Sequence, residues 1–384
     1  MSTNPNAQNL LDYLLNTSKE ARLQPKGLSL DLKGFPLEVR SNSQALLETL
    51  RYYFAGLSEW SSTSNLSSEQ TIVVYQSDVL ENAIQQTEWQ DWQREPGKTG
   101  RKDAVADVRL DEHPVRLLHK VKTGMLFMQP APFTEAVSPM AFGPAETHSS
   151  QIINFVLTQY LNHHLRHQWL LGHASALQIH NHGLAIAGLS GGGKSTLMLH
   201  LLEEGQHFIS NDRLLMKQQD DGFLSMRGIP KQPRINPGTI VHNPRLQNLI
   251  SQTERERFLA MPSESLRALE QKYDAPVNQL YHEDCYQSEA QLDALFILNW
   301  QALSPLRTQV TEVDINDRKE LLPAIMKTPG PFYAPNENGF LANGFEPEPQ
   351  DYQTLLQHCK VYEITGKIDF ESAKRQIQAL LKNF

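Results

Sequence analysis

The residues most able to do chemistry lie in the run from Gly188 to Thr196, which reads GLSGGGKST. It fits the pattern G-x-x-x-x-G-K-[ST], in which a glycine-rich backbone turns successive N–H groups toward phosphate oxygens. Lys194 is expected to neutralise the β and γ phosphates of ATP, and Ser195 is expected to bind Mg²⁺. The predicted nucleotide contacts are Gly188, Ser190, Gly191, Gly192, Gly193, Lys194, Ser195 and Thr196.

An acidic residue must usually accompany such a loop to hold the metal ion. The apolar run from Leu292 to Trp300 ends without an acid, whereas the short run FISND places Asp212 at a strand tip soon after the loop. Carboxylate and hydroxyl oxygens are the ligands that Mg²⁺ prefers. We therefore expect Asp212 and Ser195 to form the metal site.

A strand and a helix must position the loop. The apolar run from Leu184 to Ala187 supplies the strand, and the apolar positions that follow Lys194 supply one face of a helix. The alternative is a glycine-rich structural turn with a surface lysine. Agreement of strand, loop and helix favours nucleotide binding over that alternative.

This order of features resembles the kinase domain of HPr serine kinase/phosphorylase and its relatives, which share a P-loop core with phosphoenolpyruvate carboxykinase. The likeness covers His173 to about Pro237, including Gly205 and the Arg213 that follows the acid, and looks most like the branch called HprK-related kinase B. The resemblance implies an α/β fold with a C-terminal kinase domain of this type. It also implies ATP-dependent transfer of a phosphoryl group to a hydroxyl of an unidentified protein or small molecule.

The resemblance assigns roles residue by residue. His173 falls on the active-site histidine of the family, Lys194 and Ser195 on its phosphate and metal groups, and Asp212 on the second of its paired aspartates. Arg227 corresponds to a later arginine next to glycine. The catalytic residues implied are thus Lys194, Asp212, His173 and Arg227.

Two positions depart from the family pattern. Thr196 stands where the bifunctional enzymes carry Glu, and Asn211 replaces the first acid of the pair. In the family one acid is thought to serve as the base and the other to bind Mg²⁺, so the metal role is better preserved than the base. His173 is either a replacement base or a strand histidine with a local hydrogen bond.

These departures leave alternatives open. Phosphoryl transfer depends mostly on positioning and charge neutralisation, so a weaker base is compatible with a kinase. A nucleotide-binding regulator or pseudokinase is the main alternative. An assembly-linked ATPase is disfavoured, because no later strand tip supplies a second metal acid.

Weaker patterns have plainer interpretations. The histidines near His163 and His167 fit a solvated helix end better than a zinc site, and Gly97 to Lys102 fits an exposed basic turn. Arg227, Lys231 and Arg234 lie in a proline-rich loop whose cations are suited to clamp a phosphate.

The sequence predicts a polar lead-in at 1–27, a mixed α/β accessory domain at 28–148 and the nucleotide-binding domain at 149–384. Helices are expected after a capping box in the segment from Ser41 to Gln44, after a cap at Ser149 or Ser150, and from Phe370 to Leu381. Residues 323–349 hold six prolines and three glycines and predict a loop. The lead-in either docks through its leucines or stays mobile.

Composition limits the partners and the compartment. The 384 residues carry a net charge of −8, which excludes a global basic field for nucleic acid or an anionic membrane. Two distant cysteines predict no disulfide, and no run reaches about 18 apolar residues. We expect a cytoplasmic protein whose partners are the nucleotide and an acceptor, with a homo-oligomer as one possibility.

Overall fold

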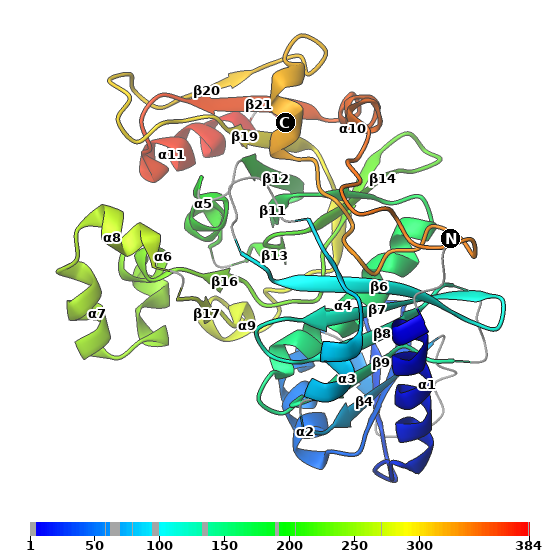
Figure 1. The fold of residues 1–384 in the computed structure, drawn as a ribbon. Helices are drawn as coiled ribbons and strands as arrows, with labels where there is room; N and C mark the ends of the chain where they lie inside the picture. Colours follow the sequence, from blue (N-terminus) through cyan, green and yellow to red (C-terminus); the bar gives the residue numbers. More distant parts are fainter. Residues whose placement is uncertain are drawn as a thin grey trace. The chain divides into compact units, whose positions relative to one another are not determined.

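A computed structural model describes residues 5–57, 59–61, 70–78, 80–93, 100–132, 137–188, 192–203, 205–269, 271–382 and 384 (Figure 1). The described chain is a mixed α/β protein with several sheets. Contacts divide it into two compact units. Unit 1 comprises Met1–His167 and Thr328–Glu346, and unit 2 comprises Gln168–Lys327 and Pro347–Phe384.

Unit 1 contains thirteen of the helices and strands in the described chain. They are α1 (Pro5–Glu20), β1 (Leu28–Asp31), β2 (Pro36–Ser41), α2 (Gln44–Phe54), β3 (Glu59–Ser61), β4 (Gln70–Gln76), α3 (Glu81–Gln86), β5 (Gln90–Asp91), β6 (Asp103–Leu110), β7 (His113–Lys120), β8 (Leu126–Pro130), β9 (Met140–Gly143) and α4 (Ser149–Arg166).

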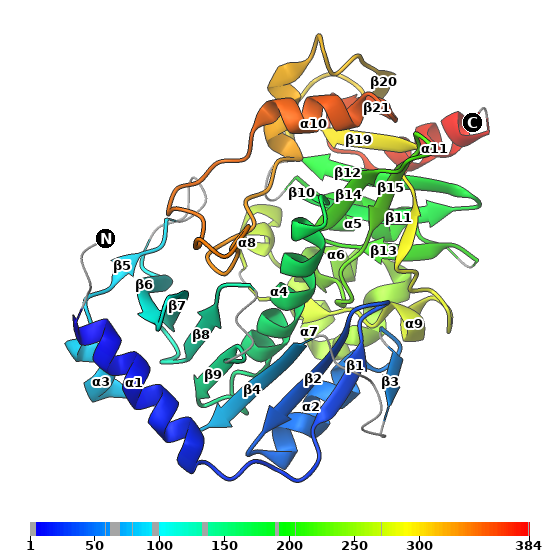
Figure 2. The same ribbon diagram turned by 90° about the vertical axis from the view of Figure 1, so that its right-hand side faces the viewer.

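A nine-stranded mixed sheet forms the centre of unit 1, in the order β3-β1-β2-β4-β9-β8-β7-β6-β5. The β2/β4 and β4/β9 pairs are parallel, and the other pairs are antiparallel. Figure 2 shows this sheet as a fan with α1 beside β6. The buried face of α1 includes Leu10, Leu11 and Leu14, so the lead-in docks through its leucines.

The helix predicted after the segment from Ser41 to Gln44 is confirmed as α2, and its N-cap is Ser43, whose side chain accepts a hydrogen bond from the Leu46 N–H. The cap predicted at Ser149 or Ser150 is wrong. Helix α4 already begins at Ser149, and its N-cap residue His148 makes no capping side-chain hydrogen bond. Either serine is a suitable N-cap residue, so the sequence did not indicate that the helix already includes both of them.

The division between units also differs from the boundary predicted at 148/149. Helix α4 belongs to unit 1, where the Phe155 ring lies 4.9 Å from Phe127. Phe332 returns from the proline-rich segment to contact both rings, at 5.9 Å from Phe127 and 5.2 Å from Phe155. This aromatic cluster draws Thr328–Glu346 into unit 1.

Unit 2 contains the remaining described elements. They are β10 (Leu170–Gly172), β11 (Ala174–Ile179), β12 (His182–Gly188), α5 (Lys194–Leu201), β13 (His207–Ser210), β14 (Leu214–Gln218), β15 (Leu224–Arg227), β16 (Arg234–Ile235), α6 (Pro237–Val241), η1 (Pro244–Leu249), α7 (Gln252–Leu259), α8 (Ser263–Ala268), β17 (Tyr273–Asp274), α9 (Val277–Leu280), β18 (Glu289–Gln291), β19 (Ala294–Leu298), β20 (Gln309–Glu312), η2 (Lys319–Ala324), α10 (Pro349–Leu356), β21 (Lys360–Thr365) and α11 (Phe370–Leu381).

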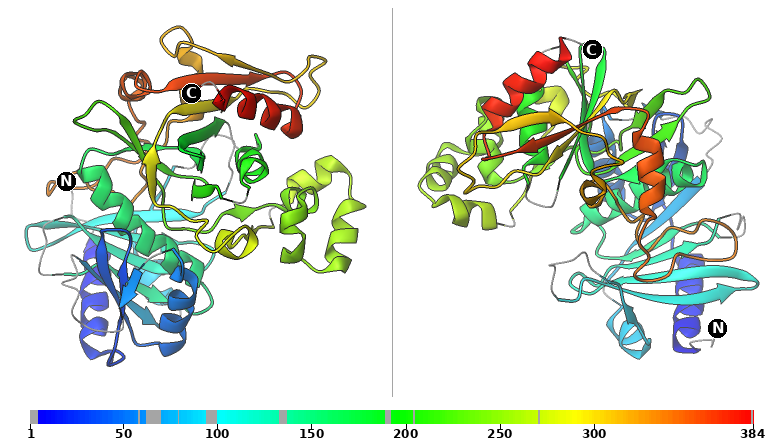
Figure 3. Two further views of the ribbon diagram at one scale, coloured as in Figure 1. Left: turned by 180° about the vertical axis from the view of Figure 1, so that it is seen from behind. Right: turned by 90° about the horizontal axis from the view of Figure 1, so that it is seen from above.

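A six-stranded sheet, ordered β13-β11-β12-β19-β21-β20, forms the main layer of unit 2. Strands β12, β19 and β21 run parallel, so their carboxyl ends meet at one edge. Figure 3 shows this sheet with α11 beside it. A second, antiparallel sheet has the order β10-β14-β15-β18, and β16 pairs with β17.

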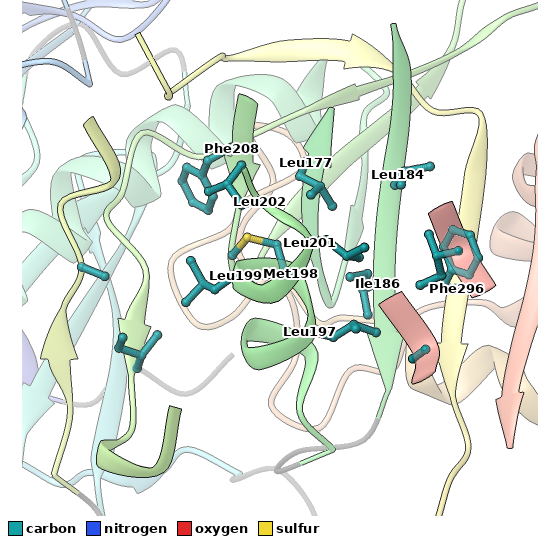
Figure 4. Packing of buried hydrophobic residues seen from close by; sticks show 14 of the residues in the cluster. Leu177, Leu184, Ile186, Leu197, Met198, Leu199, Leu201, Leu202, Phe208 and Phe296 are labelled. Atoms are coloured by element: carbon teal, nitrogen blue, oxygen red, sulfur yellow. The ribbon is translucent and has the colours of Figure 1, made fainter. Parts of the chain in front are cut away.

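Helix α5 buries an apolar face against the main sheet. Leu197, Met198 and Leu201 are fully buried in a cluster with Ile186 of β12 and Phe208 of β13, as Figure 4 shows. Burying each such side chain contributes about 1.5–3 kcal/mol, which outweighs the weak helix propensity of so short a helix. The core thereby holds the start of α5 against the carboxyl end of β12.

Several predicted elements of unit 2 are confirmed. The run from Leu184 to Ala187 lies within β12, the centre of the 292–300 run forms the buried strand β19, and α11 spans Phe370–Leu381. No helix in the described ranges combines the length and the apolar character that a membrane span requires.

Candidate functional site

The predicted phosphate loop connects the carboxyl end of β12 to the beginning of α5. The described residues resume at Gly192 after Gly188, so the predicted contacts Ser190 and Gly191 lie outside the described residues. Gly193 has a φ of 93°, a left-handed conformation that favours glycine. A Cβ at this position would lie 2.8 Å from the Phe370 ring, so the close approach also requires glycine.

Lys194 is the first residue of α5, and its side chain folds back across the loop. Its Nζ donates a hydrogen bond to the carbonyl oxygen of Gly188 at 2.8 Å, and the residue is 8 % exposed. A cation at a helix N-terminus opposes the helix dipole and is unfavourable for the helix alone. Its charge therefore adds to a positive potential that suits an anion.

Trp300 contacts the loop from the end of β19. Its indole Nε1 donates a hydrogen bond to the Gly192 carbonyl at 2.9 Å, and its ring lies edge-on to Phe370 with centroids 5.1 Å apart. This bond holds one loop carbonyl toward the protein. Sequence reasoning missed this role, because no spacing signal links Trp300 to a loop that lies more than a hundred positions earlier.

Strand register brings His173 and Asp212 to the same edge of the sheet. Ala174 of β11 pairs with Ala187 of β12, so His173 lies beside Gly188. Ala176 pairs with Ser210 of β13, and that strand then leads to Asp212.

The imidazole of His173 faces the Asp212 carboxylate, with 3.4 Å between Nε2 and Oδ1. The backbone N–H of His173 donates to the Ile325 carbonyl at 2.7 Å, which fixes the strand beneath the ring. The His173 side chain is 17 % exposed, and that of Asp212 is 59 % exposed. The pair is thus held in place and remains open to a ligand.

The charge state of Asp212 follows from its neighbours. Desolvation raises the pKa of this carboxyl, but the hydrogen bond from His173 and the charges of Lys327 and Arg213 outweigh it. The net effect holds the pKa of Asp212 well below its ordinary value. Asp212 is therefore an anion at neutral pH.

Asn211, the residue before Asp212, carries a second side-chain oxygen. Its Oδ1 is buried without a hydrogen-bond partner in the part of the chain that the structure describes, and its backbone carbonyl accepts from the Ser175 hydroxyl at 2.6 Å. An unsatisfied amide oxygen, an ionised carboxylate and the Ser195 hydroxyl are all hard oxygen donors. Their chemistry fits Mg²⁺.

Two further segments bring basic residues toward Asp212. A Cβ on Gly228 would lie 1.9 Å from the Ile209 carbonyl oxygen, so this glycine lets the loop that carries Lys231 approach β13. Met326 forms a bridge with Gly172 and places Lys327 near His173. Burial and the charge of Arg213 lower the pKa of Lys231 to about 8.

Arg227 is engaged with a different acidic residue. It lies opposite Glu289 across β15 and β18, and its Nε and Nη2 both donate to the Glu289 carboxylate. Its guanidinium also lies 5.1 Å from the Trp169 ring centroid. A carboxylate paired across a sheet cannot be anticipated from the local sequence of Arg227.

The remaining predicted residues have contacts outside the His173–Asp212 pair. The Thr196 hydroxyl hydrogen-bonds to that of Thr239 at 2.8 Å, which ties α5 to α6. The His163 and His167 rings lie 4.4 Å apart, and no group of three metal-binding side chains occurs among the residues described. Of the predicted turn at 97–102, residues 97–99 lie outside them.

Comparisons with known proteins add a distant likeness. No family model and no curated protein matches the chain. A solved structure, the Hpr(Ser) kinase/phosphatase from Coxiella burnetii, is similar over 56 % of this chain and 88 % of its own, with 15 % sequence identity and a TM-score of 0.29. Similarity at this level carries no argument about activity.

Proposed function

We propose that unit 2 is an ATP-dependent kinase that transfers a phosphoryl group to a hydroxyl. The observation that carries the proposal is the meeting of Lys194, Gly188 and the His173–Asp212 pair at one sheet edge. A phosphate loop alone accounts for nucleotide binding. A histidine and a carboxylate beside its first glycine supply the groups that an acceptor hydroxyl requires.

The proposed reaction needs a proton acceptor. A hydrogen on His173 Nε2 points to Asp212 and leaves Nδ1 as the base, while the carboxylate stabilises the imidazolium that forms. The hydroxyl oxygen then bonds to the γ-phosphorus as the bond to the bridging β–γ oxygen breaks. The hydroxyl proton passes to His173, and ADP leaves.

Lys194 and the helix N-terminus would bind the phosphate chain, and Asp212, Ser195 and Asn211 would hold Mg²⁺. The ion would supply charge neutralisation on the phosphates. Trp300 binds the Gly192 carbonyl, so this oxygen would not face the phosphates of the nucleotide.

A nucleotide-binding regulator is a second candidate. It is favoured by the amide at Asn211, which cannot accept a proton as a carboxylate can, and by the pairing of Arg227 with Glu289. The two candidates differ in a single observable, transfer of the γ-phosphoryl group.

The test is incubation of the purified full chain with γ-labelled ATP, Mg²⁺ and fractionated cell extract, with separate measurement of ATP affinity. We expect Lys194→Ala to lower ATP affinity at least about tenfold, because a charge-assisted contact is lost, and to abolish transfer. The matched control is Lys360→Ala. Lys360 is the first residue of β21, so it lies at the amino end of that strand, whereas the phosphate loop follows the carboxyl end of the parallel strand β12. Unchanged ATP affinity in folded Lys194→Ala protein would refute the loop assignment, and wild-type binding without transfer would favour the regulator.

A further inference from the structure

Two buried serine hydroxyls hold the backbone on both sides of Asp212. The Ser175 hydroxyl donates a hydrogen bond to the Asn211 carbonyl at 2.6 Å, and the Ser210 hydroxyl donates to the Arg213 carbonyl. These two carbonyls belong to the residues directly before and after Asp212. Ser175 and Ser210 are 0 % and 2 % exposed, and a buried hydroxyl that loses its partner is left unsatisfied at a cost in free energy. Both hydrogen bonds are therefore strongly favoured in the folded chain.

The regular pairing of β11 with β13 ends before the chain reaches the carboxylate. The last pair joins Ala176 to Ser210, and the register shifts by one residue just before it, which leaves Ile209 as an extra residue in β13. Such a β-bulge bends the strand and re-aims the residues that follow it. Beyond the last pair, the hydrogen bond from the Ser175 side chain to the Asn211 carbonyl continues the link between the two segments.

Ser175 also connects the two members of the His173–Asp212 pair. His173 lies two residues before Ser175 in the chain, so one short segment supplies both the imidazole and the hydroxyl that anchors the turn bearing the carboxylate. The same hydrogen bond fixes the backbone of Asn211, whose side-chain Oδ1 is buried and has no hydrogen-bond partner among the residues described. The oxygens of the candidate metal site thus depend on this anchor.

We propose that Ser175 and Ser210 are positioning residues, which preset the Asp212 carboxylate and the Asn211 side-chain oxygen to bind a divalent cation such as Mg²⁺. The metal-binding role of Asp212 rests on the proposed function, whereas the two serine hydrogen bonds do not. A site whose ligands are held in place before the ion arrives loses less conformational entropy on binding it. Removal of either hydroxyl should therefore weaken metal binding.

The experiment is a titration of the full chain with Mn²⁺, a substitute for Mg²⁺ at oxygen ligands, in the presence of a non-hydrolysable ATP analogue. Free Mn²⁺ is measured by electron paramagnetic resonance, so the readout does not require phosphoryl transfer. We expect Ser175→Ala and Ser210→Ala each to weaken Mn²⁺ binding about fivefold or more, the effect of one lost hydrogen bond. Affinity for the analogue without metal should stay within about twofold, because Lys194 and Trp300 hold the phosphate loop independently.

Two further variants separate positioning from general stability. Tyr281→Phe is the matched control, because it removes a hydroxyl that donates to the Leu199 carbonyl of α5 rather than to the turn around Asp212. Its Mn²⁺ affinity should equal that of the wild type, even where its thermal stability falls as much as that of the serine variants. If the serines act through Asp212, adding Ser175→Ala to Asp212→Asn should weaken Mn²⁺ binding by less than about a further twofold.

Three results would overturn the positioning role. They are unchanged Mn²⁺ affinity in both serine variants, a full additional loss in the double variant, and absence of Mn²⁺ binding to the wild-type chain with or without the analogue. Unchanged Mn²⁺ affinity in variants that still bind the analogue would leave the kinase proposal intact.

Failure of the wild-type chain to bind the analogue would instead refute the proposed function, and the titration with Mn²⁺ alone would then decide the role of the serines. If Ser175→Ala does not fold, Ser175→Cys takes its place, because a thiol fills the buried position but is a weak hydrogen-bond donor. The same loss of Mn²⁺ affinity is expected, and wild-type affinity in Ser175→Cys and Ser210→Ala would overturn the proposal.

Discussion

At the scale of single residues, the proposed function gives Asp212 two tasks. Its carboxylate lies 3.4 Å from His173 and would orient that ring, and its lowered pKa would keep it charged for a metal ion. Asn211 adds an amide oxygen but no negative charge. The chemistry of the site therefore depends on one carboxylate.

Asp212→Asn tests this dependence. The change preserves shape but removes the charge, so we expect Mg²⁺-dependent transfer to fall at least about 100-fold, since a metal contributes several kcal/mol of charge stabilisation. Affinity for ATP without metal should change little. The measurement is a Mg²⁺ titration of activity beside metal-free binding, and an unaltered Mg²⁺ dependence would place the metal acid elsewhere.

Asn211 and His173 decide between a kinase and a regulator. If His173 is the base, His173→Ala should lower transfer by roughly 100-fold or more with ATP binding retained. Asn211→Asp should then leave transfer similar or raise it modestly.

Single-turnover transfer with both variants is the measurement, and ATP binding is the control for folding. If the wild-type protein is inactive and only the Asn211→Asp variant transfers the phosphoryl group, the assignment of His173 as the base is contradicted. It would identify the protein as a regulator that has lost its catalytic acid.

Part of this site can be predicted from the local sequence, and the rest cannot. The loop, its strand and its helix follow from GLSGGGKST and the flanking apolar residues, because their signals are adjacent in the chain. The contact between His173 and Asp212 depends on the register of β11 with β12 and β13, which short motifs do not encode. The pairing of Arg227 with Glu289 could not be predicted either, because it depends on the register of β15 with β18.

At the scale of elements, β19 supports the loop as well as the sheet. Strand β19 is buried throughout, and the chain that leaves it delivers Trp300 to the Gly192 carbonyl. Phe370 at the start of α11 packs against the same tryptophan. The loop backbone is thereby tied to two elements that lie far from it in sequence.

Trp300→Phe tests that support. The phenyl ring keeps most of the packing but loses the hydrogen bond, so ATP affinity should fall about fivefold, the effect of about 1 kcal/mol. Tyr281→Phe is the matched control, because it removes a 3.0 Å hydrogen bond to the Leu199 carbonyl without touching the loop. Equal ATP affinity of the two variants would show that Trp300 is only a packing residue.

At the scale of the whole molecule, each unit has its own sheet and its own core, but unit 1 is not continuous in sequence. Arg116, which is 4 % exposed, forms a bidentate pair with Asp107 and donates to the carbonyls of Pro331 and Leu341. Phe332 packs against both Phe127 and Phe155. The returning segment is therefore part of the core of unit 1.

Phe332→Ala should destabilise unit 1 by about 3 kcal/mol, because it leaves a cavity where a buried ring was. Phe345→Ala, on the same segment but 38 % exposed, should cost far less. Hydrogen exchange measured separately on peptides of the two units checks this. A uniform effect on both units, or equal effects of the two variants, would contradict the expectation.

The discontinuity of unit 1 has a consequence for biosynthesis. When only residues 1–167 have emerged from the ribosome, the segment Thr328–Glu346 has not yet been synthesised. This segment accepts hydrogen bonds from Arg116 and packs on Phe127 and Phe155. Unit 1 therefore cannot complete its core until Gln168–Lys327 and the following segment have been translated. Until then it keeps an apolar surface that chaperones can bind. The amino-terminal unit thus begins folding first and finishes late.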